Sequence, residues 1–230
     1  MKAVIHQPQY FPYPGFFHKL SMADVYIIMD NTQYDKRYTN RNRIITPTGY
    51  TWITVPINKD HKFYPNKEVE INNNISWEEE HWNKIFFSYK NSKFFNLYND
   101  YFNQLYKKKW LYLFELNFET IKKTIEWLDI KVDIIKESEL NIDGKGTERL
   151  VNICKAVGAE TYISGRGLPG KKYLDEKIFE KNNIKLSYQQ YKSVKYEQHL
   201  SKEFVPDLSI IDLLFNEGHN SQNIIKINYA

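Results

Sequence analysis

The chain has a single cysteine, Cys154, among its 230 residues. An intramolecular disulfide and a Cys-x-x-Cys zinc pair are both excluded, which fits a reducing compartment. No apolar run reaches the ~20 residues that a helix needs to span a bilayer. The N-terminus has one lysine followed directly by a strand pattern, which is not the pattern of a secretory signal. We therefore expect a cytoplasmic protein without a membrane span.

A strong excess of one charge is also lacking. The sequence has 32 Lys and Arg against 28 Asp and Glu, and its net charge of +4 is too small and diffuse to indicate a nucleic-acid partner. Four scattered histidines have no metal-ligand spacing: His61, His81, His199 and His219. We find no internal repeat, and the chain is long enough for one domain with its own core. We therefore expect neither a nucleic-acid partner nor a metal site.

Apolar runs alternating with helical patterns predict an α/β fold. Residues 23–29 contain a continuous apolar run, which is typical of a buried parallel strand. Residues 14–20 separate this run from a first strand at 3–5, and they predict the short helix of a right-handed β-α-β unit. Further strands are expected at 132–135, 161–163 and 184–188, and further helices at 148–156 and 174–181. This order predicts a Rossmann-like, mostly parallel sheet with crossover helices.

Residues 76–128 have a different character. They are rich in aromatic residues and show helical periodicity in three successive segments. Before them, residues 50–56 predict a strand that ends at a proline and pairs with residues 44–45 as a hairpin. We predict a single α/β domain over residues 1–230, in which residues 76–128 form an inserted helical cap.

Polar side chains follow the first two predicted strands at the point where each strand ends. His6, Gln7 and Gln9 follow the first strand, and Asp30 and Gln33 follow the second. The carboxyl ends of parallel strands meet at one edge of a sheet, where ligands usually bind. His6 has an ordinary pKa near ~6.5 and is a candidate general base. A purely structural histidine is equally compatible with this pattern.

Asp30 is predicted either to hold the tautomer of His6 or to contact a sugar hydroxyl, with a turn-capping role as the alternative. Lys36, Arg41 and Arg43 are predicted to bind a diphosphate, because a guanidinium pairs with two oxygens at once. A solvated basic surface is the alternative for these three cations. A second polar strand end, at Ser164 and Gly165, is either an anion site or a tight turn.

The candidate catalytic residues are thus His6, Gln9 and Asp30. The candidate substrate-binding residues are Gln7, Tyr10, Gln33, Lys36, Arg41, Asn42, Arg43, Ser164, Gly165, Arg166 and Tyr173.

The segment His-Gln-Pro-Gln-Tyr-Phe-Pro at residues 6–12 resembles the WbqC-like protein family. Further matching stretches extend the resemblance over nearly the whole chain; they are residues 23–34, 40–44, 149–159, 161–165 and 204–216. The family is named after a member from a bacterial O-antigen cluster, and such clusters make and decorate amino sugars. The resemblance therefore implies an N-acyl- or aminoacyltransferase that acts on the amino group of a nucleotide-linked amino sugar in surface polysaccharide biosynthesis.

The acyl donor is left open by the sequence. A coenzyme A thioester, an acyl carrier protein thioester and an acyl group activated with ATP are the candidates, and a homodimer is also left open. The alternative functions are a glycosyltransferase, an ATP-using nucleotidyltransferase-like enzyme and a non-catalytic module that binds a sugar nucleotide or a carrier. The sequence has no Asp-x-Asp motif, the metal-binding pair that would support a glycosyltransferase. The N-terminal layout also resembles nucleotidylyltransferases, but Gly15 and His18 are not adjacent as in their triphosphate motif.

Overall fold

A computed structural model describes residues 1–165 and 174–227. Its main sheet has five parallel strands in the spatial order β5-β2-β1-β6-β7. The strands are β1 (Lys2–His6), β2 (Val25–Ile28), β5 (Asp133–Lys136), β6 (Thr161–Ser164) and β7 (Lys185–Tyr188). The predicted Rossmann-like α/β fold is confirmed.

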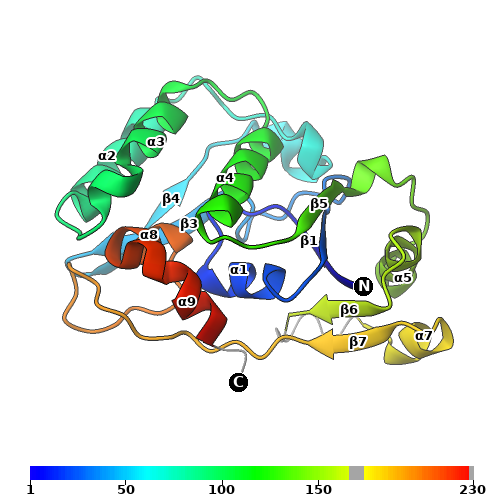
Figure 1. Cartoon of the computed structure of the whole chain (residues 1–230). Helices are drawn as coiled ribbons and strands as arrows, with labels where there is room; N and C mark the ends of the chain where they lie inside the picture. Colours follow the sequence, from blue (N-terminus) through cyan, green and yellow to red (C-terminus); the bar gives the residue numbers. More distant parts are fainter. Residues whose placement is uncertain (166–173, 228–230) are drawn as a thin grey trace.

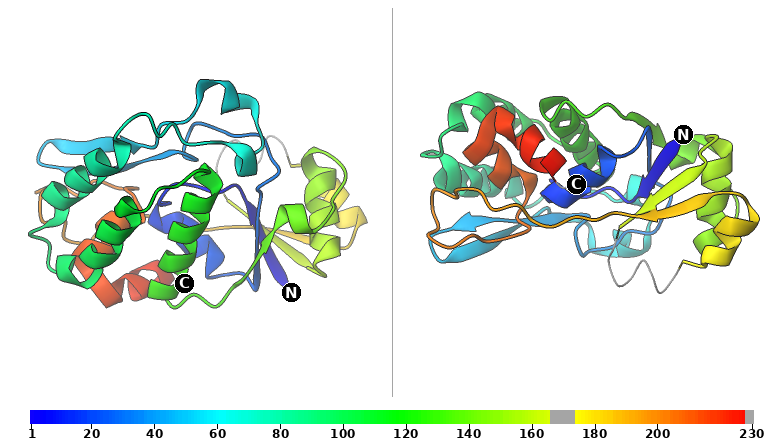
Figure 2. Two further views of the ribbon diagram at one scale, coloured as in Figure 1. Left: turned by 90° about the horizontal axis from the view of Figure 1, so that it is seen from above. Right: turned by 60° about the horizontal axis from the view of Figure 1, so that its bottom comes forward.

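Alternate residues of the central strands face two separate apolar cores, as the period of a strand requires. Val4 and Tyr26 belong to the larger core, whereas Ala3 and Val25 belong to the smaller one. The larger core includes residues of α1 (Pro14–Leu20) and α4 (Leu113–Trp127). The smaller core includes residues of α5 (Gly146–Ala156) and α7 (Glu176–Lys181). Figures 1 and 2 show α5 and α7 on the opposite side of the sheet from α1 and α4.

The strand order contains a topological switch point. From β1 the chain moves outward through β2 to β5, and it then returns to the other side of β1 to form β6 and β7. Connections on the two sides of the switch point lie on opposite faces of the sheet, and in folds of this class the ligand crevice lies at such a point, here the carboxyl ends of β1 and β6. His6 is the last residue of β1 and Ser164 is the last residue of β6. The fold therefore places both at this crevice.

The region predicted as a cap divides into two parts. Helix α4 packs in the core beside α1 and provides the crossover from β2 to β5. Helices α2 (Trp77–Tyr89) and α3 (Phe95–Lys107) pack instead with the hairpin β3 (Arg41–Thr46) and β4 (Gly49–Thr54) and with α8 (Ile210–Glu217). The chain ends in the short helix α9 (Ser221–Lys226) against α1. The described residues also contain four 3-10 turns: η1 (Lys59–Phe63), η2 (Asn66–Glu68), η3 (Glu137–Glu139) and η4 (Gly218–Asn220).

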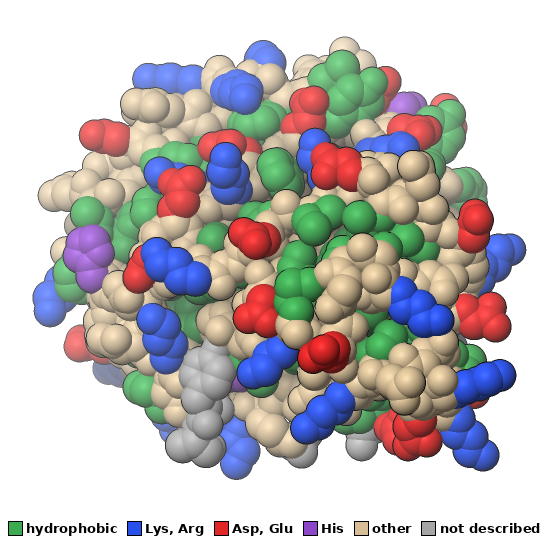
Figure 3. Space-filling model, turned by 45° about the vertical axis from the view of Figure 1, so that its right-hand side comes forward, with side chains coloured by type: hydrophobic (Ala, Val, Ile, Leu, Met, Phe, Trp, Pro, Cys, Tyr) green, Lys and Arg blue, Asp and Glu red, His purple; other side chains and the backbone are tan. Residues whose placement is uncertain are grey.

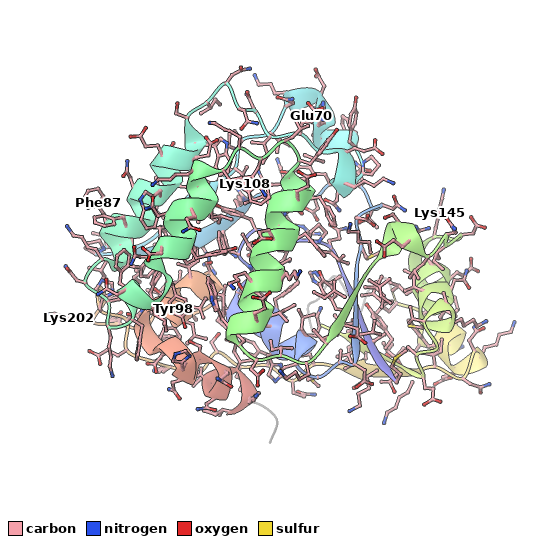
Figure 4. All side chains as sticks on the ribbon, turned by 45° about the horizontal axis from the view of Figure 1, so that its top comes forward. Glu70, Phe87, Tyr98, Lys108, Lys145 and Lys202 are labelled. Carbon is pink, nitrogen blue, oxygen red and sulfur yellow. The ribbon has the colours of Figure 1, made fainter. Side chains whose placement is uncertain are left out.

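Helices α2, α3 and α8 and the β3–β4 hairpin are called the second lobe below. Aromatic rings hold this lobe together. The ring centroid of Phe215 on α8 lies 5.0 Å from that of Tyr89 and 5.2 Å from that of Phe102. Tyr98 lies where α3 meets α8, whereas Phe87 points outward from α2 (Figure 4). Buried aromatic pairs add about 0.5–1.5 kcal/mol each to the effect of area burial. The aromatic residues of the helical region are thus explained by packing.

The surface carries both charges in close alternation. Basic and acidic side chains are interspersed on the face shown in Figure 3. Within residues 1–165 and 174–227, no helix is long and apolar enough to cross a membrane. Cys154 is buried in the smaller core, and burial raises the pKa of its thiol to about 12, which makes it a packing residue.

Candidate functional site

The loop after β1 is fixed through its main chain. Asn42 Nδ2 on β3 donates to the carbonyl oxygen of Phe11 at 2.7 Å, and Ser209 Oγ donates to the same oxygen at 3.0 Å. The amide of Ile210 donates to the carbonyl of Pro12 at 2.9 Å. These contacts hold Phe11 at a φ of 41°, a strained conformation for an aromatic residue. Parts of the chain about 30 and 200 residues away therefore shape this loop.

His6 occupies the end of β1 with a defined tautomer. Its Nδ1 lies 2.9 Å from the carbonyl oxygen of Gln7, so Nδ1 carries the proton and donates it. The lone pair of Nε2 is then the free one. The edge of Phe16 packs on the imidazole with ring centroids 5.2 Å apart. Burial and the nearby charge of Lys19 lower the pKa of His6 to about 3, so the ring is neutral at physiological pH.

Lys19 is a site residue that the sequence reasoning missed. It lies on α1, has only 5% of its surface exposed, and has no ion pair or hydrogen bond with the described part of the chain. Burial lowers its pKa to about 7. Every residue of α1 is buried. The sequence gives one indication of this role: Lys19 stands in a short crossover helix whose other residues are expected to pack against the sheet.

Gln7 and Gln9 are half-buried beside His6. Within the described residues, neither side-chain amide has a hydrogen-bond partner, so both can bind a ligand. Ser164 is buried at the end of β6, and its Oγ donates to the carbonyl of Gly165 at 3.4 Å. The register that pairs Ala3 with Tyr162 brings this strand end next to that of β1. Two further candidates, Arg166 and Tyr173, lie outside the described residues.

Asp30 does not hold the tautomer of His6. Its Oδ1 accepts from the amide of Ser138 at 2.9 Å and its Oδ2 accepts from Ser138 Oγ at 2.6 Å. The Gln7 carbonyl orients His6 instead. Asp30 lines an adjoining pocket of about 450 Å³ at the carboxyl ends of β2 and β5. The aromatic and charged side chains of this pocket include Lys67, Trp110, Tyr112, Phe118, Glu119 and Lys136.

Tyr10 and Asn42 support the loop from inside the protein. Tyr10 is fully buried, and its hydroxyl lies 2.5 Å from that of Tyr106 and 3.0 Å from Nδ1 of His81. Asn42 is 1% exposed, and its amide donates to the carbonyl oxygens of Tyr10 and Phe11 in the loop. Protein partners occupy the polar groups of both buried side chains, so the structure gives both residues a positioning role in place of the predicted substrate contact.

The predicted diphosphate-binding residues lie on and before the hairpin. The guanidinium of Arg41 stacks on Trp52 at 4.5 Å, and that of Arg43 stacks on Tyr50 at 4.8 Å. Arg43 also donates to the carbonyl of Asp207 at 2.8 Å. Burial and then the Asp207 carboxylate raise the pKa of Tyr13, which follows Pro12 at the end of the His6 loop. Because Arg43 is bonded to Asp207, Arg43 lies near this end of the loop. Two other candidates from this stretch, Gln33 and Lys36, are exposed.

His18 is enclosed by the protein. It is 1% exposed, and its Nδ1 lies 2.7 Å from Nε2 of Gln189. This burial separates the chain from the nucleotidylyltransferase motif that its N-terminal layout resembles. Among residues 1–165 and 174–227, no cluster of three or more His, Cys, Asp or Glu side chains has a geometry suited to a metal ion.

The fold and the site define a Rossmann-like α/β protein with a histidine-bearing, proline-rich loop at its switch point. The chain belongs to the WbqC-like protein family, whose model matches residues 7–224. It is 31% identical over 228 residues to "Uncharacterized protein Rv1507c" of Mycobacterium tuberculosis, an alignment that covers 98% of this chain and 97% of that protein. No solved structure matches the chain.

Proposed function

We propose that this protein is a transferase that moves an acyl or aminoacyl group onto the amino group of a nucleotide-linked amino sugar. The reaction would form an amide C–N bond and break the bond between the acyl carbon and its activating group. The proton lost by the amine ends on that leaving group. The family to which the chain belongs supports this proposal, because its name derives from surface polysaccharide biosynthesis.

The observation that carries the proposal is the orientation of His6. Its Nδ1 is committed to the Gln7 carbonyl, so the neutral ring presents Nε2 as a hydrogen-bond acceptor for a substrate N–H. An amine nitrogen becomes far more acidic while it attacks an acyl carbon, so even a weakly basic imidazole can accept its proton. The growing negative charge on the acyl oxygen would also raise the pKa of His6 during the reaction.

The neighbouring groups fit a sugar nucleotide. Gln7 and Gln9 offer amide donors and acceptors for the sugar hydroxyls or for the acyl oxygen. Arg41 and Arg43 would bind the diphosphate at the far end of the loop, since guanidinium groups match phosphate oxygens. Asp30 and Ser138 would shape the adjoining pocket. The acyl donor would be a thioester of coenzyme A or of an acyl carrier protein, or an acyl group activated with ATP.

The test is a product search by mass spectrometry. Purified protein is incubated with nucleotide-linked amino sugars and with each donor class, and a new acylated sugar nucleotide is the expected product. His6→Gln should lower turnover by about 10²–10⁴-fold with sugar-nucleotide binding retained, because a general base contributes a factor of this size. Replacement of exposed His219 by Gln is the matched control.

Two outcomes would change this proposal. Full activity in His6→Gln would remove His6 from the mechanism. Binding of the sugar nucleotide without any acylated product from any donor would favour a non-catalytic binding module.

A further inference from the structure

Lys19 is a buried cation whose counter-charge is missing. It is 5% exposed, and it has no ion pair or hydrogen bond within residues 1–165 and 174–227. The buried carboxylates that form ion pairs in this part of the chain pair with other cations: Glu78 pairs with Lys109, and Glu137 pairs with Arg149. Buried charges in proteins are almost always paired, because an ion loses most of its hydration on burial. An unpaired buried lysine at a crevice therefore needs an explanation.

Among residues 1–165 and 174–227, no carboxylate forms an ion pair with Lys19, and Asp24, in the turn after α1, accepts instead from the backbone amide of Lys2. The titratable groups on neighbouring elements include Lys2 and His6 on β1, Tyr26 on β2, Tyr191 after β7 and Lys226 on α9. Burial raises the pKa of both tyrosines, so they remain uncharged. Burial lowers the pKa of Lys19, and no carboxylate of the described residues counters this effect.

The location of Lys19 indicates where its charge acts. After burial, the charge of Lys19 is the second cause of the lowered pKa of His6, which ends β1 at the switch point. Phe16, one turn earlier on α1, packs on the same imidazole. A side chain on a helix leans toward the N-terminus of its helix, and here this direction leads toward the carboxyl ends of the strands. Gln7 and Gln9 have their unpartnered amides on the same loop.

We propose that Lys19 forms an oxyanion subsite beside His6 and binds an anionic oxygen group of the substrate through its ammonium group. The anion completes the ion pair that the protein itself lacks. This inference rests on the proposed function only for the source of the anion, which would be a phosphate of the sugar nucleotide or a carboxylate of the acyl group. The binding itself does not require any turnover.

The first test measures binding of sulfate and of formate by calorimetry. Neither ion titrates near neutral pH, so a pH effect reports on the protein. Only protonated Lys19 should bind, and a pKa of about 7 predicts that binding is about tenfold tighter at pH 6 than at pH 8. Tighter sulfate binding would indicate a phosphate as the natural anion, and tighter formate binding would indicate a carboxylate. Absence of saturable binding of both ions at pH 6 would overturn the inference.

The second test uses variants at the same position. Lys19→Met should remain folded, since loss of an uncompensated buried charge is neutral or stabilising, and it should lose the part of the binding of both ions that weakens between pH 6 and pH 8. Lys19→Arg should bind equally at pH 6 and pH 8, because a guanidinium stays protonated. Lys155→Met, at an exposed position on the other side of the sheet, is the control and should bind like the natural protein.

The outcomes separate this inference from the proposed function. If Lys19→Met binds sulfate and formate as well as the natural protein does, the subsite is disproved even when acyl transfer occurs. If the natural protein binds an anion through Lys19 but transfers no acyl group, the subsite stands and the transferase proposal falls.

Discussion

Asn42 Nδ2 donates to the carbonyl oxygen of Phe11 across 2.7 Å and 31 positions of the sequence. This bond joins the β3–β4 hairpin to the loop that carries His6. Asn42 Nδ2 also donates to the carbonyl of Tyr10 at 3.3 Å, and Asn42 Oδ1 accepts from the backbone amide of Arg43. One buried side chain thus connects the loop at the switch point with the strand that presents the two arginines.

Asn42→Ala should lower the free energy of unfolding by about 1–3 kcal/mol. The variant leaves the Tyr10 carbonyl without this donor and the Phe11 carbonyl with Ser209 Oγ alone, and the loss of buried hydrogen bonds costs an amount of this order. Urea unfolding followed by circular dichroism measures the change. Asn152→Ala is the matched control, because exposed Asn152 also donates to a backbone carbonyl, at 3.2 Å, and should cost less than about 0.5 kcal/mol. Equal losses in the two variants would contradict a central role for Asn42.

His6 should make the protein sensitive to acid. Its pKa is about 3 in the folded state and about 6.5 in the unfolded chain, so between these values the unfolded state binds more protons. Stability is therefore full above pH 6.5 and falls as the pH decreases toward 3. Between pH 7 and pH 5 the loss from this one group should reach about 2 kcal/mol. His6→Gln should show a correspondingly smaller loss, whereas His219→Gln should follow the natural protein.

Lys19 should make the protein more stable in mild alkali. Burial lowers its pKa to about 7, whereas the unfolded chain holds the proton up to about pH 10.4. Between these values the unfolded state again binds more protons, so stability rises with pH. From pH 7 to pH 9 the gain should be about 2 kcal/mol. Unfolding experiments at the two pH values should show this gain for the natural protein and for Lys155→Met. A gain of the same size in Lys19→Met would show that another group causes it.

Asp212 should be a main determinant of the second lobe's stability. Its carboxylate accepts from Tyr196 and Gln198 at 2.7 Å each and from Tyr89 at 3.0 Å. Asp212→Ala leaves these donors buried and unpaired, so we expect a loss of about 3–5 kcal/mol in the free energy of unfolding. Thermal and urea unfolding should both detect it. Asp100→Ala, at an exposed position on α3, should change stability by less than about 0.5 kcal/mol, and a comparably small effect at Asp212 would refute its structural importance.

The sequence was sufficient for the fold because local signals and burial agreed. Residues 25–29 form a continuous apolar run, and a run of this kind in a chain of alternating strands and helices is typical of a parallel strand covered on both faces. Helices that alternate with strands then define the order and the hand of the crossovers. The same pattern located His6 and Ser164 at strand ends. Residues 76–128 were correctly predicted as helical, but packing decided that α4 covers the sheet while α2 and α3 join α8.

The candidate site was only partly predictable. Strand ends identified His6, Gln7 and Gln9, but Asp30 pairs with Ser138, which is 108 positions away. Tyr10 reads as a polar loop residue, yet Tyr106 and His81 enclose it. Such partners come from distant parts of the chain, and no local pattern encodes them.

The sequence by itself determined which groups stand at the carboxyl edge of the sheet, because strand periodicity and proline positions are local properties. Only the tertiary structure decided their chemical state. His6 is neutral and Lys19 is an unpaired buried amine because of the side chains that surround them. Desolvation depends on every atom packed around a charge, and residues from the whole chain supply those atoms.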